Sequence, residues 1–203
     1  MRTGILGGTF NPPHIGHLIA AQEAHLQLGL DRVVFMPAGI PPHKQRGVEE
    51  PGAVHRLAMC RHAIGSDPRF EVSAIEIDRP GPSYTVDTLE ELNSRAPDTE
   101  LFLIVGGDIA AGLPEWREPE RVLSLATLAV AQREGTDRAS IDEALAQVEG
   151  GGRVRFFEMP MISISSSAIR ERVRTGESIR YLVPDAVAAY VDEHGLYGGT
   201  STQ

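Results

Sequence analysis

The chain has 203 residues, of which 41% are hydrophobic and 23% charged, and its formal net charge is −9. This length and composition are typical of one globular domain with its own core, and the acidic excess argues against a protein that holds nucleic acid along a basic face. No apolar run approaches the roughly 20 residues of a membrane span, and no signal peptide is predicted. The single cysteine, Cys60, excludes an intramolecular disulfide framework and predicts a buried structural thiol in a cytoplasmic protein.

Apolar, β-branched runs alternate along the chain with amphipathic stretches. The runs predict strands at residues 2–7, 33–38, 70–77, 101–107, 127–132 and 154–160. The amphipathic stretches predict helices at residues 18–28, 54–64, 86–95, 119–125, 141–148, 166–173 and 185–194. This alternation indicates a single Rossmann-like α/β domain over residues 1–203, with a mostly parallel sheet covered by helices on both faces and a frayed tail at 199–203.

The segment ILGGTFNPPHIGH, residues 5–17, joins the first predicted strand to the first helix. Gly7 and Gly8 allow the backbone to approach a ligand closely, and the free N–H groups and dipole at a helix start favour an anion. His14 and His17, three residues apart, can project to the same side. The pair could bind a metal, act as acid and base, or donate to phosphate oxygens. Zinc is disfavoured because no further ligands follow at a suitable spacing; two incidental histidines in a turn are the remaining alternative.

A second strand-to-helix transition lies in EMPMISISSSAIRERVR, residues 158–174. Ser165, Ser166 and Ser167 stand at the start of the predicted helix, and alone they indicate N-capping. With Arg170 one turn further along, they also form a second anion site. Two helix N-termini that face each other can hold a triphosphate, so the two segments taken together favour this second interpretation.

GGTFNPPHIGH and ISSSAIR together resemble the motifs of the HxGH nucleotidyltransferase superfamily. Three further segments resemble its bacterial nicotinate-nucleotide adenylyltransferase family: PAGIPPHK at 37–44, SYTVDTL at 83–89 and GGDIAAGLPEWREPERV at 106–122. HxGH alone is weakly specific, since class I aminoacyl-tRNA synthetases carry it too, but the combination spans nearly the whole chain in the family's order. Ser167 stands where the family commonly has threonine, which keeps the hydroxyl.

The resemblance implies an enzyme that transfers AMP from ATP to nicotinate mononucleotide, releasing pyrophosphate and forming deamido-NAD in NAD biosynthesis, by in-line attack of the substrate's own phosphate. Such transfer depends on positioning and on stabilising charge around phosphorus. By similarity, His17 donates to the α-phosphate, His14 positions the phosphates, and Lys44 and Arg170 offset charge on the β- and γ-phosphates. The resemblance adds ATP contacts from backbone groups of Gly8, Thr9 and Phe10, and from Gly106, Asp108, Ser165 and Ser166. A solvated loop charge is the alternative for Lys44 and Asp108.

The same resemblance assigns SYTVDTL to the nicotinate mononucleotide. Thr85 and Asp87 lie at a turn whose amides suit a carboxylate, with a helix cap as the alternative. Trp116 is the only tryptophan, and PEWREP reads as an exposed loop whose aromatic plane can stack on a pyridine ring; core packing is its alternative. Arg133 matches the family's arginine near the acceptor phosphate, or is a solvated surface residue.

Magnesium is expected to accompany ATP. Because Mg²⁺ commonly keeps its waters and binds through substrate phosphates, no protein metal ligand is assigned. The expected partners are ATP and nicotinate mononucleotide, without nucleic acid or membrane, and the sequence leaves a homo-oligomer open. The alternatives are nicotinamide mononucleotide or phosphopantetheine as acceptor, a nucleotide sensor without catalysis, and a synthetase fragment.

Overall fold

The computed structural model describes residues 1–41, 51–132, 138–148 and 153–198. Within them lies one six-stranded sheet of order β3-β2-β1-β4-β5-β6, in which every neighbouring pair is parallel. The strands are β1 (Arg2–Gly8), β2 (Arg32–Pro37), β3 (Phe70–Val72), β4 (Glu100–Gly106), β5 (Ala126–Gln132) and β6 (Val154–Glu158). The predicted α/β fold with a parallel sheet is confirmed, while the predicted frayed tail lies outside the described residues.

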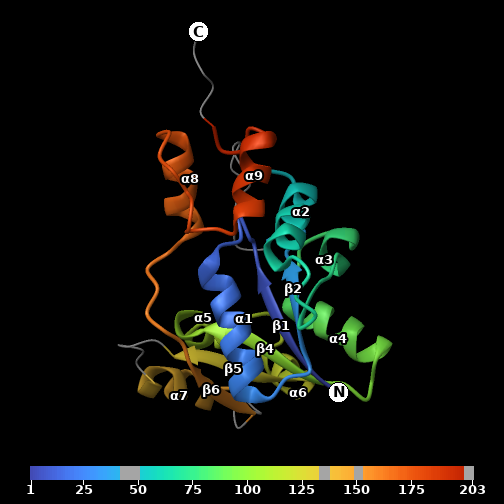
Figure 1. Cartoon of the computed structure of the whole chain (residues 1–203). Coiled ribbons are helices and arrows are strands. Elements are labelled where there is room, and N and C mark those ends of the chain that lie inside the picture. The colour runs from blue at the N-terminus through green and yellow to red at the C-terminus, as the bar shows by residue number, and fades with distance from the viewer. Residues whose placement is uncertain (42–50, 133–137, 149–152, 199–203) are drawn as a thin grey trace.

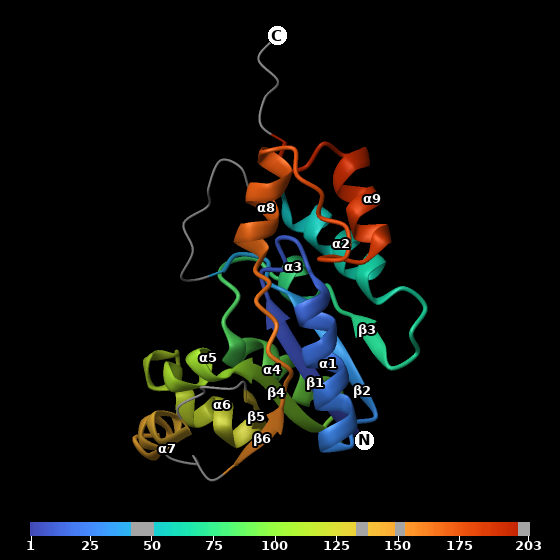
Figure 2. The ribbon, with the colours of Figure 1, turned by 60° about the vertical axis from the view of Figure 1, so that its left-hand side comes forward.

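Helices cover both faces of this sheet (Figure 1). They are α1 (Ile15–Leu28), α2 (Ala53–Ile64), α3 (Ile75–Asp78), α4 (Thr85–Arg95), α5 (Gly107–Ala111), the 3₁₀ helix η1 (Leu113–Glu115), α6 (Pro119–Leu125), α7 (Arg138–Ala146), α8 (Ser166–Arg174) and α9 (Asp185–Glu193). Figure 2 shows α1 on one side of the sheet and α5, α6 and α7 on the other. In both views α2, α8 and α9 group together at one end of the molecule.

Each face of the sheet has its own apolar core, because successive strand residues point to opposite sides. In β1, Ile5 packs with the cluster that includes α4, α6 and α7, whereas Leu6 packs with the cluster that includes α1 and α2. A third cluster, with Met59, Ile169 and Val187 among its members, joins α2, α8 and α9. Burying one large apolar side chain contributes about 1.5–3 kcal/mol, so these clusters dominate the stability of the fold.

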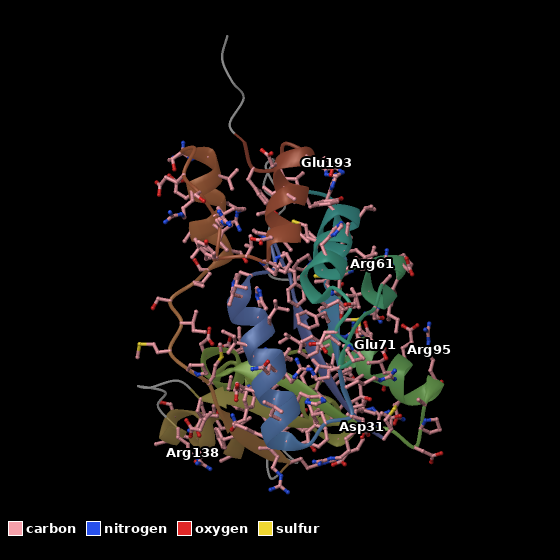
Figure 3. The ribbon with its side chains drawn as sticks, viewed as in Figure 1. Asp31, Arg61, Glu71, Arg95, Arg138 and Glu193 are labelled. Atoms are coloured by element: carbon pink, nitrogen blue, oxygen red, sulfur yellow. The ribbon has the colours of Figure 1, made fainter. Side chains whose placement is uncertain are left out.

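Exposed charged side chains contribute less to the stability of the fold than these apolar clusters do. Arg61, Arg95 and Arg138 are exposed and lie at the periphery in Figure 3. Arg95 pairs with Glu91 one turn earlier on α4, and an exposed pair of this kind is worth roughly 0–1 kcal/mol. The surface ion pairs therefore do not decide how the strands are ordered.

The strand order places a switch point beside β1. From β1 the chain moves outward through β2 and β3, and it then returns to add β4, β5 and β6 on the other side of β1. In open parallel sheets the crevice beyond the carboxyl ends of the strands at such a point is where ligands bind. The first sequence motif follows β1 and the GGD segment lies at the end of β4, so both reach this crevice.

The strand predicted at residues 70–77 is wrong in its second half, because β3 ends at Val72 and α3 occupies Ile75–Asp78. Ser73 makes one more backbone bond, from its N–H to the oxygen of Phe35. Its hydroxyl then accepts the N–H of Ile75 at 3.3 Å. This side-chain bond offers the backbone a turn in place of further ladder pairing.

Cys60 is buried in α2 and is a structural thiol, as predicted. Burial raises the pKa of its thiol to about 12 against a smaller opposing effect of Arg56, so the reactive thiolate is scarcely formed at neutral pH. In the described part of the chain, no helix combines the length and the apolar character that crossing a membrane requires.

Candidate active site

A cavity of about 470 Å³ lies at the switch point. Its walls come from the carboxyl ends of β1 and β4, from the start of α1, from the segment around α3 and α4, and from the start of α8. The residues of the predicted site that line it are Gly8, His14, His17, Thr85, Gly106, Trp116, Ser165 and Ser166. Residues far apart in the sequence thus meet at one cavity, as the two strand-to-helix motifs predicted.

His14 and His17 are held together at the start of α1. The backbone N–H of His14 donates to Nδ1 of His17 at 3.1 Å, and the two rings stack with centroids 3.7 Å apart. In a capping box, a Glu or Gln side chain accepts the backbone N–H of the N-cap residue, and here the His17 side chain does so. With this bond α1 begins at Ile15, three residues before the predicted start. Because Nδ1 accepts, the ring proton of His17 is on Nε2, and the imidazole offers one donor.

The buried ring of Phe10 packs against the ring of His17. Its side chain is 2% exposed, and its ring meets that of His17 edge-on at 4.9 Å. The carbonyl of Thr9 accepts a hydrogen bond from Nη1 of Arg56 at 2.9 Å. Of the three residues whose backbone the resemblance assigned to the nucleotide, Gly8 lines the cavity. The side chain of Phe10 belongs to the core and packs against His17, and the backbone contacts of Thr9 and Phe10 with a nucleotide stay a prediction.

The start of α8 is fastened to the first motif through backbone oxygens. Ser166 Oγ donates to the carbonyl of Pro12 at 2.9 Å, 154 residues away in sequence. Arg170 Nη1 donates to the carbonyl of Asn11 at 2.9 Å. Beyond α9, Tyr197 donates its hydroxyl to Asn11 Oδ1 at 2.6 Å. The turn before α1 is therefore held in place by residues from the last part of the described chain.

Ser165 is the N-cap of α8, and its Oγ accepts the N–H of Ala168 at 3.2 Å. The capping interpretation is therefore confirmed, and the same side chain also lines the cavity, while its contact with a nucleotide stays a prediction. Arg170 lies outside the cavity lining and donates from Nη2 to Ser167 Oγ at 3.3 Å. Its guanidinium has five N–H donors, which leaves it able to bind an anion as well.

On the opposite wall, Thr85 begins α4 and Trp116 follows η1. Both line the main cavity, and with Tyr84 and Arg117 they also line an adjoining cavity of about 480 Å³. Arg117 lies over the ring of Tyr84 at 4.7 Å. Asp87 pairs with Arg117 at 3.7 Å instead of lining either cavity.

Asp108 is exposed in the first turn of α5, outside the cavity lining, next to Gly106, which does line it. A Cβ atom at Gly106 would lie 2.7 Å from Asp108 Oδ1, so a larger residue there would displace the Asp108 carboxylate from its present position. Lys44 and Arg133, assigned by resemblance, lie outside the described residues.

Matches with known proteins agree with this geometry. The cytidylyltransferase-like family model covers residues 5–172. A Roseiflexus sp. (strain RS-1) protein named "Probable nicotinate-nucleotide adenylyltransferase" is 50% identical, over 96% of this chain and 96% of its own. A Thermus thermophilus protein of the same name is 46% identical, over 97% of this chain and 100% of its own.

The chain belongs to the nicotinate-nucleotide adenylyltransferase family. Among solved structures, Plasmodium falciparum nicotinic acid mononucleotide adenylyltransferase complexed with NaAD matches with a TM-score of 0.79 over 97% of each chain. At 16% identity that likeness shows the shared fold. The family resemblance that the motifs indicated is confirmed.

Two buried charged residues of this adenylyltransferase were missed by sequence reasoning. Arg56, 4% exposed, donates from Nη1 to Thr9 O and from Nη2 to Gly39 O at 3.0 Å. The position of Arg56 on α2 could have indicated its burial. It lies three residues before Met59 and four before Cys60, and it therefore shares their buried helix face. Glu76 fell within the strand predicted at residues 70–77, and that prediction did not indicate that its side chain is buried.

Glu76 is 8% exposed and lines the main cavity. Burial raises the pKa of its carboxyl above the ordinary value, and hydrogen bonds from Thr88 and Ser83 and the charge of Arg79 offset part of this effect. For metal ions, the described ranges contain no group of three or more His, Cys, Asp or Glu residues that could hold one.

Proposed function

We propose that this chain transfers AMP from ATP to nicotinate mononucleotide, forming deamido-NAD and releasing pyrophosphate. The observation that carries the proposal is one continuous cavity with two differently equipped ends. One end has two helix N-termini, an imidazole donor and two serines, which suit phosphates. The other has a tryptophan beside the start of α4, which suits an aromatic ring bearing an anionic group. The names of the relatives at 46–50% identity support the same reaction.

At the phosphate end, His17 is the donor with the best-defined geometry. Its Nδ1 accepts the N–H of His14, which orients the ring, and Nε2–H is the group proposed to donate to an α-phosphate oxygen. A preorganised donor of this kind stabilises the charge that develops on those oxygens in the transition state. His14 stacks on the ring and contributes the N–H that fixes its tautomer, and it is proposed to help position the phosphates.

The reaction itself needs no protein nucleophile. An oxygen of the acceptor's phosphate attacks the α-phosphorus, the bond from that phosphorus to the bridging oxygen breaks, and pyrophosphate leaves in line. Arg170, which keeps free donors beyond its bonds to Asn11 and Ser167, and Lys44 are proposed to offset the charge of the β- and γ-phosphates. Magnesium carried on ATP would neutralise further phosphate charge.

At the acceptor end, we place the pyridine ring against Trp116 and its carboxylate at the start of α4. The N-cap of α4, Tyr84, makes no side-chain cap bond, so the first-turn amides beginning at Thr85 can bind a carboxylate. Asp87 is proposed to act through its ion pair with Arg117, and Arg133 to bind the acceptor phosphate. Gly106 and Asp108 are proposed to lie against the ribose of ATP.

The test is to incubate the purified protein with ATP, Mg²⁺ and either nicotinate or nicotinamide mononucleotide, and to separate the products by chromatography. We expect deamido-NAD and pyrophosphate in equal amounts, with faster turnover of the nicotinate substrate. Faster turnover of the amide would replace the proposed acceptor, and turnover of neither mononucleotide would overturn the reaction.

A further inference from the structure

A chain of hydrogen bonds converges on Glu76 from both sides. On one side, the N–H of Gly39 donates to Ser83 Oγ at 2.9 Å, and the Ser83 hydroxyl in turn lowers the pKa of Glu76 against the larger effect of burial. On the other side, Arg79 Nη2 donates to Thr88 Oγ1 at 2.7 Å. The Thr88 hydroxyl then donates to Glu76 Oε1 at 2.7 Å. Both arms deliver donors, and the carboxyl oxygens of Glu76 are the acceptors at their meeting point.

The two hydroxyls bracket the residue that faces the acceptor end. Ser83 and Thr88 lie on either side of Thr85, and Glu76, Ser83 and Thr85 all line the same cavity. The N–H of Ser83 also donates to the carbonyl of Ile40 at 2.8 Å. One buried carboxylate thus fixes the turn that enters α4, because its two bonds hold that turn at its entrance and one turn into the helix.

The same network reaches the loop after β2. A Cβ atom at Gly39 would lie 2.2 Å from the carbonyl oxygen of Glu76, so that loop packs directly on α3. The carbonyl of Gly39 accepts from Arg56, which also binds Thr9 beside the phosphate end. The acceptor end is therefore positioned by buried side chains instead of by a local motif.

We propose that Glu76 is a positioning residue for the acceptor: through Ser83 and Thr88 it holds the first turn of α4 where its amides meet the acceptor's carboxylate. The inference rests on the proposed function. Glu76 is not required as a general base, because the attacking phosphate oxygen is already ionised at neutral pH. Its contribution belongs to binding of the acceptor and should leave ATP binding and the chemical step unchanged.

The experiment measures steady-state kinetics for Glu76→Gln and for the matched pair Thr88→Val and Thr88→Ser, with each substrate varied in turn. Glu76→Gln and Thr88→Val are expected to raise the KM for nicotinate mononucleotide about tenfold, with the KM for ATP and kcat changed by less than about threefold. Thr88→Ser, which keeps the hydroxyl, should restore the wild-type KM. The control is Glu90→Gln, an exposed position on α4 paired with Arg121, and it should behave as wild type.

Three results would overturn the role of Glu76: an unchanged acceptor KM in Glu76→Gln, an equal rise in both KM values, or Thr88→Ser behaving like Thr88→Val. If Glu76→Gln does not fold, the comparison of Thr88→Val with Thr88→Ser tests the proposal by itself. Titration of Trp116 fluorescence with nicotinate mononucleotide gives a readout without turnover, since Trp116 is the only tryptophan. A wild-type protein that makes no deamido-NAD would count against the proposed function, whereas active wild type with unaffected variants would count against Glu76 alone.

Discussion

The phosphate end and the acceptor end of the cavity are built in different ways. At the phosphate end, a strand, a turn and a helix follow one another within 28 residues, and the His14–His17 bond spans three. At the acceptor end, the turn into α4 is held by side chains from other segments, with Gly39 and Ser83 separated by 44 residues. The histidine pair of the first end is arranged by a local bond, with Ser166, Arg170 and Tyr197 fastening the turn before it. The turn into α4 at the second end has no such local bond and depends on the buried network around Glu76. Mutations should therefore separate chemistry at one end from acceptor binding at the other.

The largest effect is expected from His17→Ala at the phosphate end. Loss of one preorganised donor to the developing charge should lower kcat by about 10²–10³-fold, as for a missing oxyanion-hole donor. The melting temperature should fall by only a few degrees, because His17 is half-buried and its bond caps only the first turn of α1. Steady-state assays and thermal unfolding check this, with the exposed His62→Ala as control. A near-normal kcat in folded His17→Ala would remove His17 from the mechanism.

The next effect tests the link between the two ends. Arg56→Met keeps an apolar stem but leaves the carbonyls of Thr9 and Gly39 without their buried donor, and each such loss costs about 1–3 kcal/mol. We expect the free energy of unfolding in urea to fall by about 2 kcal/mol or more, and the KM values for both substrates to rise. Arg61→Met, an exposed position on the same helix, is the control. A rise confined to one substrate would show that the ends are not linked through Arg56.

A smaller effect is expected at Trp116. Stacking contributes about 0.5–1.5 kcal/mol beyond buried area, so Trp116→Ala should raise the acceptor KM by about three- to tenfold and leave the ATP KM unchanged. Trp116→Phe should keep most of the affinity. If Trp116→Ala raised the ATP KM instead, the two ends of the cavity would have to be exchanged.

At Ser165 the expected effect is on stability. Ser165→Ala removes the N-cap of α8 and should lower the free energy of unfolding by about 1 kcal/mol. Ser165→Asn keeps a capping oxygen and should be close to wild type in stability. Chemical denaturation distinguishes the two, and equal stabilities would mean that the cap bond contributes nothing measurable.

The smallest expected effect is a dependence of protein stability on pH that arises from Glu76 at the acceptor end. Since burial raises the pKa of Glu76 above 4.5, the folded protein binds this proton more tightly than the unfolded chain. Its contribution to stability is therefore full below the unfolded pKa and is lost as pH rises through the folded pKa. The melting temperature of Glu76→Gln relative to wild type should increase between pH 4 and pH 7. A difference independent of pH would contradict this.

The contrast also explains what the sequence could predict. The parallel sheet follows from patterns within single elements, and the meeting of the HxGH and ISSSAIR segments could be predicted only because both are anion-binding helix starts that suit one triphosphate. The burial of Glu76, the contact of Arg56 with two loops and the pairing of Asp87 with Arg117 depend on which segments pack together, which no local pattern contains. Phe10 shows the intermediate case, because its motif predicts the turn but not that the ring supports His17 from the core.

The bond from Tyr197 to Asn11 has a consequence for synthesis of the chain. The turn before α1 is translated long before α8 and α9, yet its fastening requires Ser166, Arg170 and Tyr197. A nascent chain can pair β1 with β2 early, but it completes the phosphate end only after residue 197 has been translated. The growing polypeptide should therefore remain without adenylyltransferase activity until that residue has left the ribosome.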